Sequence, residues 1–169
     1  GNTRPGIVSE ASGTCLAALT LTERLPDPVP AGMLHGEFPI PGYYAVLAYA
    51  KTAGAVLEWF RRELAPGMSL RELDALAAAS PIGSNGVSMS PHFEGAVSPV
   101  PNPAARGAFA HLTLGAALGD LYRAILEALT FALRENLEFL GRYGMTMQMI
   151  RSIGGGAKSD LWLQMKADL

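Results

Sequence analysis

Short apolar runs and longer periodic stretches divide this chain of 169 residues into predicted strands and helices. Runs rich in apolar and β-branched residues predict strands at residues 7–12, 15–22, 43–49, 87–93, 109–112 and 147–153. Gly13 and Thr14 lie between the first two runs, which predicts a hairpin with a tight two-residue turn. After the second run, a loop is expected because several residues there break regular strand pairing: Pro26, Pro28, Pro30 and Gly32.

Spacings of three and four residues mark the helices. The longest apolar stripe predicts a helix over residues 118–140, carried by Leu118, Leu121, Tyr122, Ile125, Leu126, Leu129, Leu133, Leu137 and Leu140. Gly144 is the expected stop. A helix over residues 53–64 should bury Val56, Trp59, Phe60 and Leu64. Ser69 and Glu72 have capping-box spacing ahead of a helix to about Ala79, and a last helix begins at Ser159 or Asp160. Strands mixed with helices indicate the α/β class.

Composition narrows the classes of function. Thirteen Lys and Arg nearly balance fifteen Asp and Glu, for a net charge of −2, so no basic field is available for nucleic acid or an acidic membrane. No apolar run reaches membrane-spanning length, and a cytoplasmic location is the simplest interpretation. Cys15 is the only cysteine, which excludes an internal disulfide. His35, His92 and His111 lack metal-ligand spacing, so we expect no protein-held metal.

Residues 154–162, GGGAKSDLW, connect a predicted strand to a predicted helix. Glycines let a backbone approach a ligand closely, and a helix N-terminus presents free N–H groups, which suits a nucleotide. A plain tight turn with Ser159 or Asp160 as N-cap is an equal alternative from the residues alone. The pattern matches neither the GxGxxG turn of a dinucleotide-binding oxidoreductase nor a P-loop. Residues 95–107 form a long loop with Pro99, Pro101 and Pro103, and its length hints at a function.

Several segments resemble, in family order, the FGGY family of carbohydrate kinases. They are SEASGTCLAALT, KTAGAVLEWFRREL, PHFEGAVSPVPNPAARGAF, RGAFAHLTLGAALGDLYRAILEALTFALRENLE and GGGAKSDLWLQMKADL. The resemblance implies a ribonuclease H-like, actin-like ATPase fold with ATP bound between two domains. Residues 1–169 would be an incomplete C-terminal, ATP-binding domain, with the N-terminal sugar-binding domain outside this chain. One departure is Ala96, after Glu94-Gly95, where the family usually carries a basic residue.

The resemblance also implies roles for single residues. Gly13 and Thr14 would meet the phosphates of ATP, and Gly54 and Glu58 would lie near the ribose and phosphates. For Thr14 an ordinary turn residue, and for Glu58 an exposed helix charge, remain open as alternatives. The adenine would be flanked by Gly155, Gly156 and Ala157. Ser159 would either form a hydrogen bond with the base or cap the helix. Mg²⁺ would be held mainly through the nucleotide.

The catalytic base implied by the family is an aspartate just upstream of the phosphate hairpin. Glu10 is the only carboxylate before Gly13 and is too close to the turn, so we expect that aspartate upstream of Gly1 and no catalytic residue here. The implied function is ATP-dependent phosphorylation of a sugar or polyol, in a xylulokinase-like protein whose chain is cut at both ends. A homodimer is compatible with it. The alternatives are a glycerol-type kinase and a non-catalytic nucleotide-binding relative.

Overall fold

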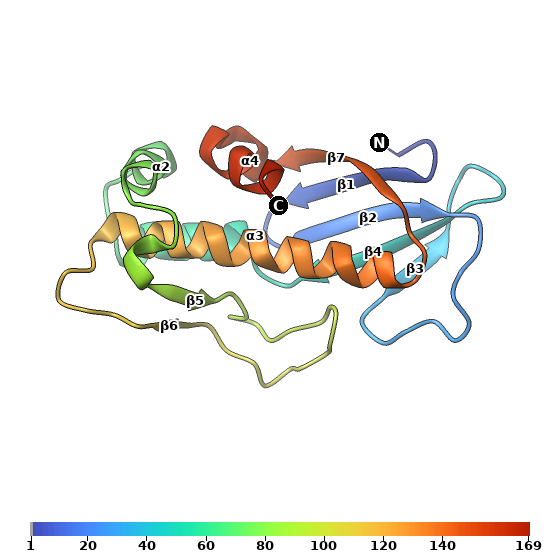
Figure 1. Cartoon of the computed structure of the whole chain (residues 1–169), viewed down its shortest axis with the longest axis horizontal. Helices are drawn as coiled ribbons and strands as arrows, with labels where there is room; N and C mark the ends of the chain where they lie inside the picture. The colour runs from blue at the N-terminus through green and yellow to red at the C-terminus, as the bar shows by residue number, and fades with distance from the viewer. Residues whose placement is uncertain (1) are drawn as a thin grey trace.

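A computed structural model describes residues 2–169, which form a five-stranded sheet with helices packed against it (Figure 1). The strand order is β3-β4-β2-β1-β7. The strands are β1 (Gly6–Ser12), β2 (Leu16–Thr22), β3 (Leu34–Glu37), β4 (Tyr44–Ala50) and β7 (Met147–Gly154). Neighbouring pairs are antiparallel except β1 and β7, which are parallel, with Ser12 opposite Gly154. The ends of β1 and β7 therefore lie together, although β7 comes late in the sequence.

Residues 2–169 also contain four α-helices and two short 3₁₀ helices. The α-helices are α1 (Gly54–Glu63), α2 (Leu70–Ala79), α3 (Leu118–Arg142) and α4 (Asp160–Ala167). The 3₁₀ helices are η1 (Ser84–Gly86) and η2 (Gly155–Lys158), and β5 (Ser88–Ser90) pairs with β6 (Ala108–Ala110) in a separate two-stranded sheet. None of the helices in residues 2–169 combines the length and the apolar character that a bilayer crossing requires.

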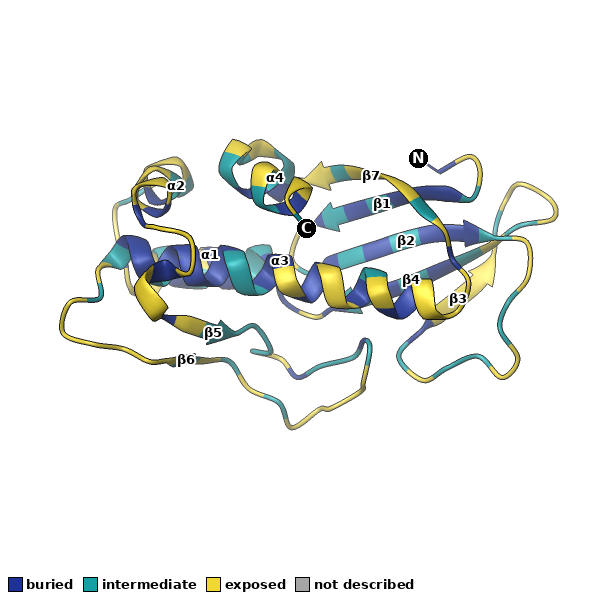
Figure 2. Cartoon of the chain, in the orientation of Figure 1, coloured by how far each residue is buried: buried dark blue, intermediate teal, exposed yellow. Residues whose placement is uncertain are grey.

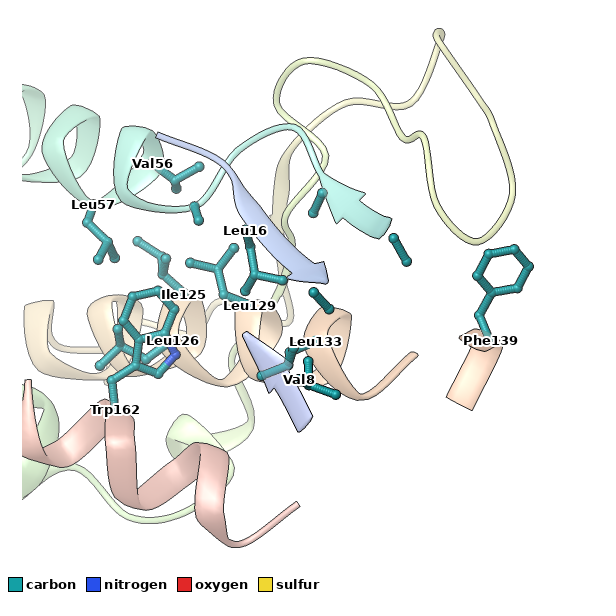
Figure 3. Packing of buried hydrophobic residues seen from close by; sticks show 14 of the residues in the cluster. Val8, Leu16, Val56, Leu57, Ile125, Leu126, Leu129, Leu133, Phe139 and Trp162 are labelled. Atoms are coloured by element: carbon teal, nitrogen blue, oxygen red, sulfur yellow. The ribbon is translucent and has the colours of Figure 1, made fainter. Parts of the chain in front are cut away.

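The hydrophobic core lies between the sheet and α3. The predicted stripe on α3 faces the strands: Ile125, Leu129 and Leu133 are fully buried. They form one cluster with Val8 of β1 and Leu16 of β2 (Figure 3). Figure 2 shows the same division along α3, with buried positions toward the sheet and exposed positions away from it. The apolar stripe predicted from the helical period of the sequence is thus confirmed as the face of α3 that packs on the sheet.

Two helix boundaries follow from local chemistry. The Ser69 hydroxyl accepts a hydrogen bond from the Glu72 N–H, and the Glu72 carboxylate accepts one from the Ser69 N–H, so the predicted capping box is present. Gly144 has a φ of 85° and follows the end of α3, as expected for a glycine that ends a helix.

The hairpin turn and two predicted strands differ from the sequence expectations. Ser12 pairs with Leu16, so three residues, not two, connect β1 and β2. The run at residues 87–93 contributes only β5, because Val87 closes η1 and Pro91 has no N–H for a ladder. The run at 109–112 is shifted to β6, which ends before His111, a residue with a φ of 61°.

The strand β3 and the buried face of α1 also differ from the sequence expectations. The strand β3 was not predicted, because its four residues are all exposed and carry no apolar alternation. On α1, Val56 and Phe60 are buried as expected, but Leu64 is 45% exposed and Leu57 is buried in its place. The loop prediction for residues 95–107 holds, apart from one isolated bridge between Ala96 and Asn102.

Candidate functional site

A cleft of about 1000 Å³ opens where the β1–β2 turn, α1, α2, α3, η2 and α4 converge. Segments from both ends of the chain contribute to it, since β1 and β7 pair in parallel and deliver their following turns to one edge of the sheet. Its lining comprises Ser12, Gly13, Thr14, Gly54, Ala55, Leu57, Glu58, Leu70, Arg71, Asp74, Ala75, Ala78, Tyr122, Leu126, Gly155, Gly156, Lys158, Ser159, Asp160, Leu161 and Trp162. Seven of the eight residues predicted to contact nucleotide are in this lining, and Ala157 is not.

The β1–β2 turn is held against the amino end of α1. The N–H groups of Gly54 and Ala53 donate to the carbonyls of Gly13 and Thr14 at 2.8 and 2.9 Å, and Ala55 adds a longer bond to Thr14 at 3.3 Å. A Cβ atom at Gly54 would collide with the Gly13 carbonyl, so only glycine permits this approach. The first N–H groups of α1 are therefore used to fix the turn, whose Gly13 and Thr14 remain exposed at the cleft.

The glycine-rich turn packs directly on the end of β1. Gly154 has a φ of 87°, and a Cβ atom there would lie 2.9 Å from the Ser12 carbonyl oxygen. At Gly156 a Cβ atom would collide with the Ser12 Cβ and lie 2.6 Å from the Trp162 ring. Gly155 is different, since its nearest neighbour would be the Ser12 carbonyl oxygen at 3.9 Å. The sequence GGG thus contains two sterically required glycines and one with free space at the cleft.

Ser159 begins α4 by accepting a hydrogen bond from the Trp162 N–H at 3.1 Å. The capping role of Ser159 is therefore present in the structure. Trp162 is fully buried, and its indole Nε1 donates to the Thr130 hydroxyl on α3 at 3.0 Å. This bond, together with the packing of Trp162 against Leu126, fixes α4 and its cap on α3 (Figure 3).

A buried polar cluster lies behind the two turns. Lys166 on α4 donates from Nζ to Glu10 Oε2 and to Ser12 Oγ, both at 2.9 Å, and the Ser12 hydroxyl donates to Glu10 Oε1. The ammonium also lies 4.0 Å from the centroid of the Trp162 ring. Burial lowers the pKa of Lys166, and the Glu10 carboxylate opposes that shift. The cluster ties α4 to β1 beneath the cleft.

A second polar group sits on the α2 side of the cleft. Burial raises the pKa of the Asp74 carboxyl, and hydrogen bonds from the hydroxyls of Ser159 and Tyr122 act against the rise. Burial and the nearby charges of Asp74 and Glu58 raise the pKa of Tyr122 well above its ordinary value. Tyr122 is 1% exposed, and both Tyr122 and Asp74 line the cleft.

Glu58 and Lys158 line the cleft but are exposed. Glu58 forms an ion pair with Arg61 at 2.8 Å, in which its side chain keeps 53% of its surface exposed. Such pairs contribute little to stability, so this contact leaves Glu58 available to other partners. Within residues 2–169 no group of three or more His, Cys, Asp or Glu side chains is arranged to hold a metal ion.

Sequence reasoning missed Asp74, Tyr122, Trp162 and Lys166. Each belongs to a helical apolar or charged pattern that indicates packing and surface, and Lys166 looks like an ordinary exposed lysine near the end of the chain. The signal that could have found Lys166 is Glu10, a carboxylate in the middle of an otherwise apolar and small-residue strand, which requires a buried partner.

Comparison with known proteins identifies the family. Residues 11–169 match the C-terminal domain of the FGGY family of carbohydrate kinases. Xylulose kinase of Staphylococcus epidermidis is 35% identical over 130 residues, 77% of this chain and 26% of that protein. Xylulose kinase of Bacillus subtilis is 38% identical over 117 residues, 69% of this chain and 23% of that protein.

The solved structures agree with the sequence matches. The crystal structure of xylulose kinase from Rhodospirillum rubrum superimposes with a TM-score of 0.91 at 31% identity, over 99% of this chain and 34% of that chain. The chain therefore spans 23–34% of the length of these relatives. Its α/β fold is the actin-like ATPase fold of the FGGY sugar kinases. The chain belongs to the FGGY family of carbohydrate kinases, and residues 11–169 correspond to the C-terminal domain of that family.

Proposed function

We propose that this chain is the nucleotide-binding part of an ATP-dependent, xylulokinase-like enzyme that phosphorylates a hydroxyl group of a sugar or polyol. The observation that carries the proposal is the convergence of two glycine turns on one cleft. The β1–β2 turn and η2 come from opposite ends of the sequence, yet both line the same 1000 Å³ space. A cleft of that size is typical of a nucleotide or drug-sized ligand.

The phosphate end of the nucleotide is assigned to the β1–β2 turn. Gly13 and Thr14 are exposed there, and a threonine hydroxyl can donate to a phosphate oxygen. Three hydrogen bonds from the start of α1 hold the turn, so its backbone is preorganised for an anionic ligand. Gly54 acts by permitting that approach, and Glu58, one turn further along α1, is within the lining near the ribose.

The adenosine end is assigned to η2 and the start of α4. A Cβ atom added at Gly155 would have no neighbour closer than the Ser12 carbonyl oxygen at 3.9 Å, so a flat base can lie against the Gly155 backbone. Gly156 and Ser159 line the same wall, while Ala157 belongs to η2 but not to the lining. The apolar side chains Leu70, Ala78 and Leu161 offer the surface that a purine requires.

The remaining parts of the reaction lie outside residues 1–169. Phosphoryl transfer needs a group that accepts the proton of the substrate hydroxyl, and Glu10 is committed to Lys166 in the interior. We therefore assign the catalytic aspartate and the sugar-binding domain to sequence upstream of Gly1. Mg²⁺ would be bound through the phosphates of ATP. The protein is expected in the cytoplasm, with a homodimer as a compatible assembly.

A coupled assay of ATP consumption by the full-length protein tests the activity. Ketoses, aldoses and polyols are offered in parallel, and turnover is expected with a ketose such as xylulose. Turnover with glycerol alone would instead support the glycerol-type alternative. ATP binding without turnover on any acceptor would support the non-catalytic alternative.

The site is tested by Gly155→Phe. Because there is room beside Gly155 and this space opens into the cleft, the aromatic ring should fill the adenosine end while the fold stays intact. ATP affinity should fall at least about tenfold, the effect of losing about 1.4 kcal/mol of binding free energy. Gly36→Phe is the matched control, since Gly36 is exposed on β3 with nothing within 4 Å. Unchanged ATP affinity in Gly155→Phe would contradict the assignment of the adenosine end.

A further inference from the structure

The buried ammonium group of Lys166 joins α4 to β1 behind the cleft. Its Nζ atom donates to Glu10 Oε2 and to Ser12 Oγ, both at 2.9 Å. Within residues 2–169 these are the only hydrogen bonds between α4 and β1, which lie close together in Figure 1. Ser159 caps α4 at one wall of the cleft, and β1 leads into Gly13 at the other. One side chain therefore connects the elements that carry both walls.

Ser12 links this ammonium to the two glycine turns. Its hydroxyl accepts from Lys166 and donates to Glu10, so the side chain is fixed by two bonds. Gly13 follows it directly and begins the β1–β2 turn. A Cβ atom at Gly156 would collide with the Ser12 Cβ, so η2 packs directly on the same residue. A displacement of Ser12 would consequently change the spacing between the two turns.

Each turn also has contacts of its own that do not involve Lys166. The N–H groups of Gly54 and Ala53 hold the β1–β2 turn at 2.8 and 2.9 Å. Ser159 accepts from the Trp162 N–H at 3.1 Å, and the Trp162 indole is bonded to α3. These contacts give each turn its shape, but they do not join one turn to the other. Their relative placement depends on the β1–β7 ladder and on the Lys166 junction.

Stability is a poor explanation for a charged pair at this place. Lys166 and Glu10 are 5% and 0% exposed, and desolvation offsets much of the attraction in such a pair. A benefit attested for some buried ionic groups is that they fix one arrangement of the elements they join. The Trp162 ring, with its centroid 4.0 Å from the ammonium, adds a third constraint on the position of Lys166.

We propose that Lys166 is a positioning residue that sets the spacing between the two turns, so that the two halves of ATP bind as one ligand. The inference rests on the proposed function, in which the phosphates lie against the β1–β2 turn and adenosine lies against η2 and the start of α4. Linked groups bind much more tightly than separate ones only when their sites are held at the span of the link. Lys166 does not line the cleft, so it acts through Ser12 and not by contact with the ligand.

The test compares ATP with its two halves, adenosine and tripolyphosphate, as ligands of the full-length protein with Mg²⁺ present. Glu10→Leu/Lys166→Met removes the junction without leaving an isolated charge, so the fold should be retained. Its affinity for ATP should fall at least about tenfold, while its affinity for each half changes by less than about threefold. Arg134→Met/Glu138→Leu, which removes an exposed ion pair of α3 outside the lining, should alter none of the three affinities.

An unchanged ATP affinity in Glu10→Leu/Lys166→Met would overturn the inference. So would an equal loss for ATP and for either half, because that result indicates a damaged turn and not a changed spacing. A wild type that binds neither ATP nor the two halves would overturn the proposed function itself. Thermal unfolding reports whether the double variant is folded. If it is not, Ser12→Ala decides the question, since it removes the linking hydroxyl, keeps the ion pair and should show the same selective loss of ATP affinity.

Discussion

Lys166 Nζ lies 2.9 Å from Glu10 Oε2, and both side chains are buried, at 5% and 0% exposure of the whole residue. The pair joins the last helix to the first strand, and Ser12 is bonded to both partners at the edge of the cleft. A buried ion pair is weak evidence of net stabilisation, since desolvation offsets much of the attraction. Removal of one partner is a different matter, because it leaves an unpaired charge in the interior.

Lys166→Met should therefore destabilise the protein by about 3–5 kcal/mol, as expected when one partner of a buried pair is lost. The double variant Glu10→Leu/Lys166→Met should recover most of that loss, because no isolated charge remains. Chemical denaturation of the two variants and the wild type measures both values. Lys158→Met, at an exposed lysine, is the control and should change stability by less than about 0.5 kcal/mol. A cost below about 1 kcal/mol for Lys166→Met would contradict the burial of this pair.

Neighbouring glycines of η2 should respond differently to alanine. Gly156→Ala forces a methyl group against Ser12 and Trp162, so we expect a loss of about 1–3 kcal/mol and weaker ATP binding as the turn shifts. Gly155→Ala adds the same methyl group where there is room, and its stability should stay within about 1 kcal/mol of wild type. Thermal unfolding and nucleotide titration distinguish them. Equal effects from the two substitutions would argue against the packing of Gly156 on β1.

The hydrogen bond from Trp162 to Thr130 offers a third test. Thr130→Val keeps the side-chain volume but removes the acceptor of the buried indole N–H, which should cost about 1–3 kcal/mol. Thr130→Ser keeps the hydroxyl and should lose less, through the missing methyl group alone. Denaturant midpoints at unchanged m-values report the difference. A Thr130→Val protein as stable as Thr130→Ser would show that the indole finds another acceptor.

Acid should weaken the junction between α2, η1 and α3 through Asp120. Hydrogen bonds from Ser80, the Ala117 N–H and Asn85 lower the pKa of this carboxyl below its ordinary value of 3.8. Below pH 3.8 the unfolded state thus binds more protons than the folded state, so the contribution of Asp120 is complete above that pH and is lost as the pH falls toward the folded value. In stability curves from pH 6 down to about pH 2, Asp120→Asn should flatten the acid slope, and Ser80→Ala should reduce it partly. A slope identical in all three proteins would exclude Asp120 as its source.

The main elements of the fold could be predicted because their patterns are local. The stripe on α3, the capping box of α2 and the stop at Gly144 each depend on residues a few positions apart. The strand β3 could not be predicted, since its pairing with β4 requires no apolar pattern in four exposed residues. Leu64 was misplaced for a related reason: the helical period defines a face, but only tertiary packing decides which residue at its margin is covered.

The candidate site was predicted in part. The glycines could be found because the residue type itself indicates a close backbone approach. The structure shows the neighbouring atoms that leave no room for a side chain at Gly54 and Gly156. Lys166 could not be assigned, because its significance comes from Glu10, a partner 156 positions away in sequence. Polar contacts between residues far apart in the sequence produce no periodic pattern from which they could be predicted.

The parallel pairing of β1 with β7 has a kinetic consequence. Ser12 and Gly154 face each other across that ladder, so the turns that follow them meet only after nearly the whole chain has been gathered. Closing so long a loop is entropically unfavourable and slow compared with forming α3 or the β1–β2 hairpin. The cleft should consequently be among the last features to form during refolding, and recovery of nucleotide binding should lag behind recovery of helical signal.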